Sequence, residues 1–154
     1  MALLALAGFV SAADYCYDKP SKVVSLPFWA TSDQLPCMYS GTLPANSKAG
    51  TNHNLFYWLF KSAQARPDAP LVLWLNGGPG SSSMFGLFVE NGPLRVARNG
   101  TGTGDFIVSL PRDGQGSWID EGVDMVFVDQ PVGVGFSYGD SLATTMQKIS
   151  DDMV

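Results

Sequence analysis

The chain has 154 residues, of which 45% are hydrophobic and 12% aromatic, so it is long and apolar enough for one globular domain with a core. Its formal net charge of −5 provides no basic surface for phosphates, which argues against a nucleic-acid partner. No segment beyond the N-terminus is long and apolar enough to span a bilayer.

The first residues, MALLALAGFVSAAD, are typical of a secretory signal peptide. Residues 2–10 form an apolar core, and the small residues that follow suit cleavage near Ala12 or Ala13. The positive charge that usually precedes such a core is missing, so a start further upstream and a buried first element are alternatives. We expect a signal peptide over residues 1–12 and one domain over residues 13–154.

Two cysteines and one sequon become relevant on a secretory route. Cys16 and Cys37 can form a disulfide in an oxidising compartment, and two free structural thiols are the alternative. Asn99 begins the sequon Asn-Gly-Thr within the polar, glycine-rich run ARNGTGTGD, where a glycan would be tolerated. Asn99 is therefore a glycosylation candidate.

The pattern of the following residues predicts an α/β fold. CMYSGTL (residues 37–43) and NLFYWLFKS (54–62) are β-rich runs joined by a turn-prone segment, which indicates an antiparallel pair. PLVLWLN (70–76) is a short apolar run typical of a strand buried on both faces. SSSMFGLFVEN (81–91) predicts a helix with an N-cap among its serines and an end at the Gly-Pro pair that follows.

Beyond a loop rich in Gly and Asp, the pattern predicts two further elements. VDMVFVDQP (123–131) indicates a second buried strand that its proline ends. DSLATTMQKISDDMV (140–154) places four apolar residues on one face of a helix: Leu142, Met146, Ile149 and Met153. A hairpin followed by strand, helix, strand and helix is the beginning of a mostly parallel sheet covered by helices.

The run NGGPG (76–80) lies between the predicted strand and the helix that follows it. In open α/β sheets this carboxyl edge binds ligands, and backbone N–H groups at a helix start bind carboxylates, phosphates or oxyanions. No lysine follows the glycines, as a P-loop requires, and G-x-G-x-x-G does not fit. Two interpretations remain: a receptor for an oxyanion or carboxylate, and a tight turn that needs glycine only for packing.

GFSYG (135–139) matches the G-x-S-x-G pattern of a nucleophile elbow, in which Ser137 would be the nucleophile. The elbow requires its strand to run directly into the first glycine, whereas here VGV separates the two. It also requires a histidine downstream, and the only histidine, His53, lies upstream. We therefore interpret Ser137 as a loop serine and His53 as a turn residue on the solvent side.

Four groups of residues occur together in one order: MYSGTLP with HNLFYWLFKS, LWLNGGPGSSS, VENGP, and SWIDEGVDMVFVDQPVGVGFSYGDS. In this combination the chain resembles the N-terminal portion of the serine carboxypeptidases, above all their pheromone-processing and lysosomal-type members. The resemblance implies an α/β-hydrolase fold and the removal of single amino acids from the C-termini of peptides and proteins through an acyl-enzyme. It also implies no cofactor, no metal, and a secreted, vacuolar, lysosomal or Golgi location.

The resemblance assigns roles to individual residues around the glycines. Gly78 would donate its backbone N–H to the oxyanion of the tetrahedral intermediate. Asn76 and Gly77 would hydrogen-bond the free α-carboxylate of the substrate. Glu90, buried and protonated, would complete this carboxylate site as a hydrogen-bond donor, with Trp74 beside it. Because only the C-terminal residue of a peptide carries a free α-carboxylate, an enzyme that requires this group would be an exopeptidase.

By the same resemblance, Phe85 would lie near the pocket for the leaving C-terminal residue. Because Phe85 offers only apolar surface, we expect apolar leaving residues to be preferred to lysine or arginine. Family members usually have a cysteine where this chain has Ser81, so the disulfide of that cysteine is lost here.

The family's catalytic serine, aspartate and histidine lie in segments that have no counterpart among these 154 residues. We therefore expect an N-terminal fragment that is inactive and poorly soluble by itself. A carboxypeptidase-like acyltransferase and a non-catalytic protein that binds peptide C-termini are the alternatives. A downstream GESYGG motif followed by Asp and His would favour the enzyme.

Overall fold

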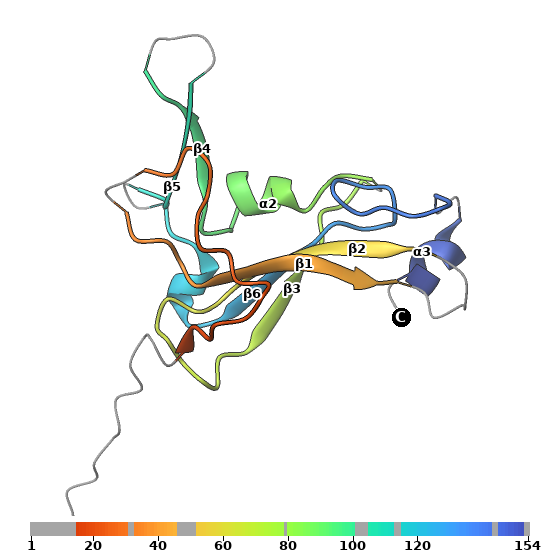
Figure 1. The fold of residues 1–154 in the computed structure, drawn as a ribbon, viewed down its shortest axis with the longest axis horizontal. Coiled ribbons are helices and arrows are strands. Elements are labelled where there is room, and N and C mark those ends of the chain that lie inside the picture. The colour runs from red at the N-terminus through yellow and green to blue at the C-terminus, as the bar shows by residue number, and fades with distance from the viewer. Residues whose placement is uncertain are drawn as a thin grey trace, which may run out of the picture.

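The computed structural model describes residues 15–30, 33–45, 52–78, 80–100, 105–112, 115–142 and 145–152. Its centre is a four-stranded sheet whose spatial order is β1 (Met38–Pro44), β2 (Asn54–Phe60), β6 (Asp124–Val128) and β3 (Leu71–Trp74) (Figure 1). The β1–β2 and β2–β6 pairs are antiparallel, whereas β3 and β6 are parallel. The predicted opening pair and the predicted parallel strands are therefore both present.

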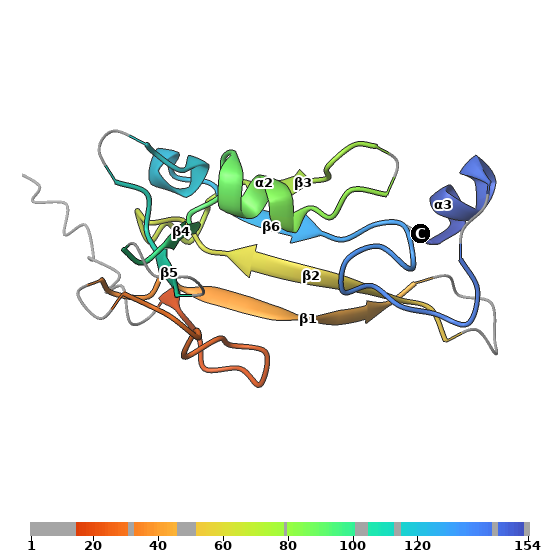
Figure 2. The same cartoon turned by 90° about the horizontal axis from the view of Figure 1, so that it is seen from above.

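The remaining elements surround this sheet. Helix α2 (Met84–Val89) lies over one face, next to β6, and the 3-10 helix η1 (Trp118–Glu121) leads into β6 (Figure 2). The strands β4 (Arg95–Arg98) and β5 (Phe106–Ser109) form a separate antiparallel hairpin. The sequence predicts a loop there, and this prediction is wrong. Each hairpin strand has only four residues, and pairing stabilises both: β4 lies antiparallel to β5, in which Phe106, Ile107 and Val108 are strand-forming residues.

One face of the central sheet carries the core, because alternate side chains of a strand point to the same side. Met38, Phe60 and Met125 are register partners across β1, β2 and β6, and all three are fully buried. Phe127, two residues further along β6, packs edge-on against Phe60 with ring centroids 6.1 Å apart. Leu87 of α2 belongs to the same cluster. This burial holds α2 in place, since a helix of six residues is too short to be stable in isolation.

Strand β3 differs from its prediction as a strand buried on both faces. Val72 and Trp74 pack against the core, but Leu71 is 64% exposed and Leu73 50% exposed. β3 is the last strand of the sheet, with β6 as its neighbour, and the described residues leave its second face open to solvent. An apolar run indicates that a strand can be buried, but it does not show how much of the strand other elements cover.

The last helix, α3 (Met146–Asp152), begins later than the predicted segment 140–154. Leu142 precedes the helix, and both Leu142 and Met146 are exposed. Met153 lies outside the described residues. The helical prediction is confirmed for residues 146–152, whereas Leu142 and Met146, at the start of the predicted apolar face, do not lie in a core.

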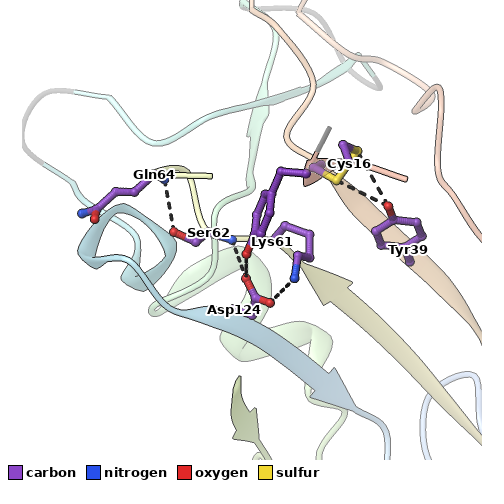
Figure 3. A network of polar contacts seen from close by, with 8 residues as sticks. Cys16, Tyr39, Lys61, Ser62, Gln64 and Asp124 are labelled. Carbon is purple, nitrogen blue, oxygen red and sulfur yellow. Dashed lines mark hydrogen bonds and ion pairs between the residues drawn. A yellow bond between two sulfur atoms is a disulfide. The ribbon is translucent and has the colours of Figure 1, made fainter. Parts of the chain in front are cut away.

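A polar cluster fastens the N-terminal segment to the sheet (Figure 3). A disulfide joins Cys16 to Cys37, so the described residues contain no free thiol. Asp124, the first residue of β6, accepts hydrogen bonds from the Tyr15 hydroxyl at 2.6 Å and from the Ser62 N–H at 2.8 Å.

The same cluster contains an ion pair between Asp124 and Lys61. Burial, followed by the hydrogen bond to Asp124, raises the pKa of the Tyr15 phenol. Burial by itself would lower the pKa of the Lys61 ammonium, but its hydrogen bonds with Asp124 and Tyr15 outweigh that effect and raise it. The N-terminal segment is thus held to β6 at the end where this strand begins.

Candidate active site

Two loops meet at the opposite end of β6. Residues 76–83 follow β3, and residues 129–138 follow β6, so both loops start at the carboxyl ends of parallel strands. They lie side by side (Figures 1 and 2), and hydrogen bonds from Ser82 and Phe136 to the Asp129 carboxylate connect them. This is the edge at which α/β sheets bind ligands.

The Asn76 side chain connects β3 to the middle of α2 and to Glu90, the residue at the C-cap of that helix. Its Oδ1 accepts hydrogen bonds from Trp74 Nε1 at 2.9 Å and from the Gly86 N–H at 3.1 Å. Its Nδ2 donates to Glu90 Oε1 at 3.3 Å. The structure therefore brings together Trp74, Asn76 and Glu90, three of the residues that the resemblance places around a carboxylate.

Trp118 of η1 also belongs to this site, although it is not among the site residues predicted from the sequence. Its ring packs edge-on against Trp74, with ring centroids 5.7 Å apart. The segment SWIDEG resembles the family, but no local signal indicates that its tryptophan reaches β3. A 3-10 helix placed before β6 brings it there.

Gly77 and Gly78, which follow Asn76, are both exposed. A Cβ on Gly77 would meet nothing within 4 Å, so packing does not require a glycine there. Gly78 has φ +143°, a conformation that residues with side chains rarely adopt. A Cβ on Gly78 would also lie 3.0 Å from the Gly80 N and 3.1 Å from the Ser81 N, so the turn itself requires a glycine there, whereas the backbone at Gly77 is open to a ligand.

Two predicted site residues of α2 face solvent. Glu90, at the C-cap of the helix, is exposed, so the prediction that it is buried is wrong for the described part of the chain. The helix ends at the surface of the described part of the chain, and only the Asn76 amide reaches the carboxylate by a hydrogen bond. Phe85 is 53% exposed, which leaves its ring available to a ligand.

Ser137 is confirmed as a loop serine. It is 4% exposed, its Oγ donates a hydrogen bond to the Asp129 carbonyl at 2.6 Å, and the same Oγ accepts one from the Phe56 N–H at 2.8 Å. This hydroxyl therefore joins β2 to the loop after β6. His53, predicted on the solvent side, is half-buried, because Gly139 approaches its ring closely.

An open groove of about 870 Å³ lies at the other end of β6, beside the Tyr15–Lys61–Asp124 cluster. Its lining includes Cys16 and Cys37 but none of the residues expected to bind substrate. The carboxyl edge with its two loops remains the candidate active site, because the open backbone and the converging polar groups lie there.

Other predicted features lie away from this edge. Asn99 is exposed directly after β4, where its N–H donates to the Asp105 carbonyl at 2.9 Å. Over residues 15–152, apart from the short gaps given above, no group of three or more His, Cys, Asp or Glu side chains is arranged to hold a metal ion. Within the same described part of the chain, every helix is too short or too polar to cross a membrane.

The sheet begins with the antiparallel strands β1 and β2, continues with the parallel strands β3 and β6, and has a glycine loop at its carboxyl edge. This arrangement is the beginning of an α/β-hydrolase domain. The sequence model of the family described as serine carboxypeptidase matches residues 31–154. The chain therefore belongs to the serine carboxypeptidase family, as its motifs predict.

Similarity to individual proteins agrees with this assignment. The chain is 46% identical over 102 residues to the probable serine carboxypeptidase CPVL of Homo sapiens, covering 66% of this chain and 19% of that protein. It is 42% identical over 121 residues to the pheromone-processing carboxypeptidase KEX1 of Clavispora lusitaniae, covering 75% and 17% of the two chains.

Among solved structures, the chain resembles a prohormone-processing carboxypeptidase from Saccharomyces cerevisiae, with a TM-score of 0.53 and 39% identity. The match covers 67% of this chain and 21% of that one. The chain thus spans only a minor part of the length of the proteins that it matches.

Proposed function

We propose that the protein is a serine-type carboxypeptidase that removes single amino acids from the C-termini of peptides and proteins, and that this chain supplies the N-terminal part of the enzyme. The observation that carries the proposal is the exposed backbone of Gly77 and Gly78 beside the Asn76–Glu90 pair. Nothing packs where a side chain on Gly77 would lie, and converging polar groups stand next to it.

The chemistry of the site follows from the hydrogen-bond donors that it offers. A substrate α-carboxylate needs donors, and the Asn76 amide and the Gly77 N–H would supply them beside Glu90. The Gly78 N–H would stabilise the oxyanion, a contact whose loss costs about 2.7–4 kcal/mol in comparable enzymes. The nucleophilic serine, its histidine and its aspartate would come from the part of the family's length that this chain does not span.

The test compares two substrates that differ only at the C-terminus. A blocked dipeptide with a free carboxylate should be cleaved by the full-length enzyme, and its C-terminal amide should lose at least ~100-fold in kcat/KM, about 2.7 kcal/mol. Equal cleavage of both would contradict a carboxylate site. Transfer of an acyl group to a second substrate would indicate an acyltransferase, and binding without release would indicate a non-catalytic protein.

Phe85 is proposed to contact the leaving residue, and its exposure permits that contact. A leaving arginine would lose water there without gaining a partner, whereas a leaving leucine gains roughly 25 cal/mol for each Å² it buries. In the full-length enzyme we expect a higher kcat/KM for Leu than for Arg, and Phe85→Asp should shift the ratio toward Arg.

The control for Phe85→Asp is Val96→Asp, which places the same charge at an exposed position of the β4–β5 hairpin. This control should leave the Leu/Arg ratio of kcat/KM unchanged. A native preference for Arg, or the same shift in both variants, would remove Phe85 from the specificity site.

We further propose that the protein enters the secretory pathway and reaches the exterior or a vacuolar, lysosomal or Golgi compartment. The disulfide between Cys16 and Cys37 supports this proposal, because such bonds persist in oxidising compartments. The exposed Asn99 is accessible to a glycan.

A further inference from the structure

A buried carboxylate connects the two loops of the candidate active site. Asp129 follows β6 directly and is fully buried. Its Oδ1 accepts hydrogen bonds from Ser82 Oγ at 2.6 Å and the Ser83 N–H at 2.8 Å, and its Oδ2 accepts one from the Phe136 N–H at 2.9 Å. A carboxylate is costly to bury unless such donors compensate it, so these three bonds define its position strictly.

Ser83 connects the two ends of the glycine loop (residues 76–83) by hydrogen bonds. Its Oγ accepts a hydrogen bond from the Asn76 N–H at 3.1 Å and donates one to the Val128 carbonyl at 2.5 Å. The hydroxyl therefore joins both ends of the loop 76–83 to β6. This explains why Ser83, although it occupies the N-cap of α2, makes no side-chain capping bond.

The loop after β6 is shaped around the same carboxylate. Gly135 has φ +56°, and a Cβ there would overlap Asp129 Oδ2 and lie 2.9 Å from Ser82 Oγ. The Phe136 N–H then points at the carboxylate. Asp129 is thus enclosed by both loops and restrains each of them.

We propose that Asp129 is a positioning residue for the oxyanion donor, a role that rests on the proposed carboxypeptidase function. The Gly78 N–H lies only four residues before Ser82, on a loop whose tip makes no packing contact at Gly77. The anchor at Ser82 and Ser83 therefore determines where that N–H points. An oxyanion donor must be held within a few tenths of an ångström, about 0.5 Å, of its working position.

The side-chain amide of Asn76, which would bind the substrate carboxylate, depends on a different anchor. It is held by hydrogen bonds from Trp74 Nε1 and the Gly86 N–H, whereas Asp129 accepts its hydrogen bonds from Ser82, Ser83 and Phe136. Loss of the Asp129 anchor should therefore affect kcat far more than KM. A loss of stability alone would leave both constants unchanged for the molecules that remain folded.

The experiment compares Asp129→Asn with Asp124→Asn in the full-length enzyme. Both residues are buried at the two ends of β6, and each carboxylate has three polar partners. Asparagine keeps the shape but replaces one acceptor oxygen with a donor that faces another donor. Activity is measured per active site, titrated with an irreversible serine-directed inhibitor.

Asp129→Asn should lower kcat per titrated site by about 10–100-fold, with KM changed by less than about threefold. Asp124→Asn should lower the melting temperature and leave kcat per titrated site unchanged, because that residue holds the N-terminal segment instead. An unchanged kcat in Asp129→Asn, or an equal loss in both variants, would overturn the proposal.

Two further measurements cover the remaining cases. If Asp129→Asn does not fold, Ser82→Ala removes the 2.6 Å bond to Asp129 together with the 3.2 Å bond that Ser82 Oγ accepts from the Met84 N–H. It should lower kcat per site by about 2–5-fold, and an unchanged kcat overturns the proposal. If the unmodified protein releases no amino acid, the proposed function fails. Hydrogen exchange at Gly77 and Gly78 then decides the positioning role: faster exchange in Asp129→Asn than in Asp124→Asn supports it, and equal exchange overturns it.

Discussion

Replacement of Phe127 by alanine is expected to lower the free energy of unfolding by about 3–5 kcal/mol. The side chain is fully buried at the centre of the sheet, where β6 lies between β2 and β3, and its ring packs edge-on against Phe60. The substitution removes both the buried apolar area and the ring contact, and the strands on either side prevent the cavity from collapsing. Urea unfolding of the full-length protein measures the change.

Val24→Ala is the control for Phe127→Ala. Val24 is an exposed apolar residue, so its truncation should change the free energy of unfolding by no more than about 0.5 kcal/mol. A loss below about 1.5 kcal/mol for Phe127→Ala would show that the core around β6 can relax, and would contradict the tight packing seen here.

Gly86→Ala is expected to destabilise the protein by about 1–3 kcal/mol, although helix propensity alone predicts a gain of about 1 kcal/mol. A Cβ on Gly86 would overlap Trp74 Nε1 and lie 2.7 Å from Asn76 Oδ1. The indole and the carboxamide would have to move, and the hydrogen bond from the Gly86 N–H to Asn76 would be strained. Steric overlap with two ordered side chains outweighs a backbone preference.

The same substitution should raise KM for substrates with a free carboxylate by about 10-fold or more, equivalent to about 1.4 kcal/mol, because it displaces Asn76. Gly116→Ala is the matched control, since a Cβ there meets nothing within 4 Å, and it should leave both stability and KM nearly unchanged. A stabilised Gly86→Ala variant with an unchanged KM would show that α2 does not need to approach Trp74 so closely.

The sequence by itself determined the elements whose signals are local. The β-rich runs around Met38 and Phe60, the apolar runs of β3 and β6, and the helix after the glycines follow from alternation, continuity and turn residues over a few positions. Ser137 could be set aside as a nucleophile in the same way, because the spacing of the glycines from the preceding strand is visible in the chain. Local patterns also distinguished the glycine loop from a P-loop.

Only the tertiary structure decided which of these elements are covered and which side chains meet. The exposure of Leu73 depends on what lies against β3, and the β4–β5 hairpin depends on pairing between two segments of only four residues each. Trp118 reaches Trp74 of β3 across 44 residues of sequence, and Asp129 reaches Ser82 of the glycine loop across 47. Burial and long-range contacts are properties of the assembled sheet, so no window of neighbouring residues contains them.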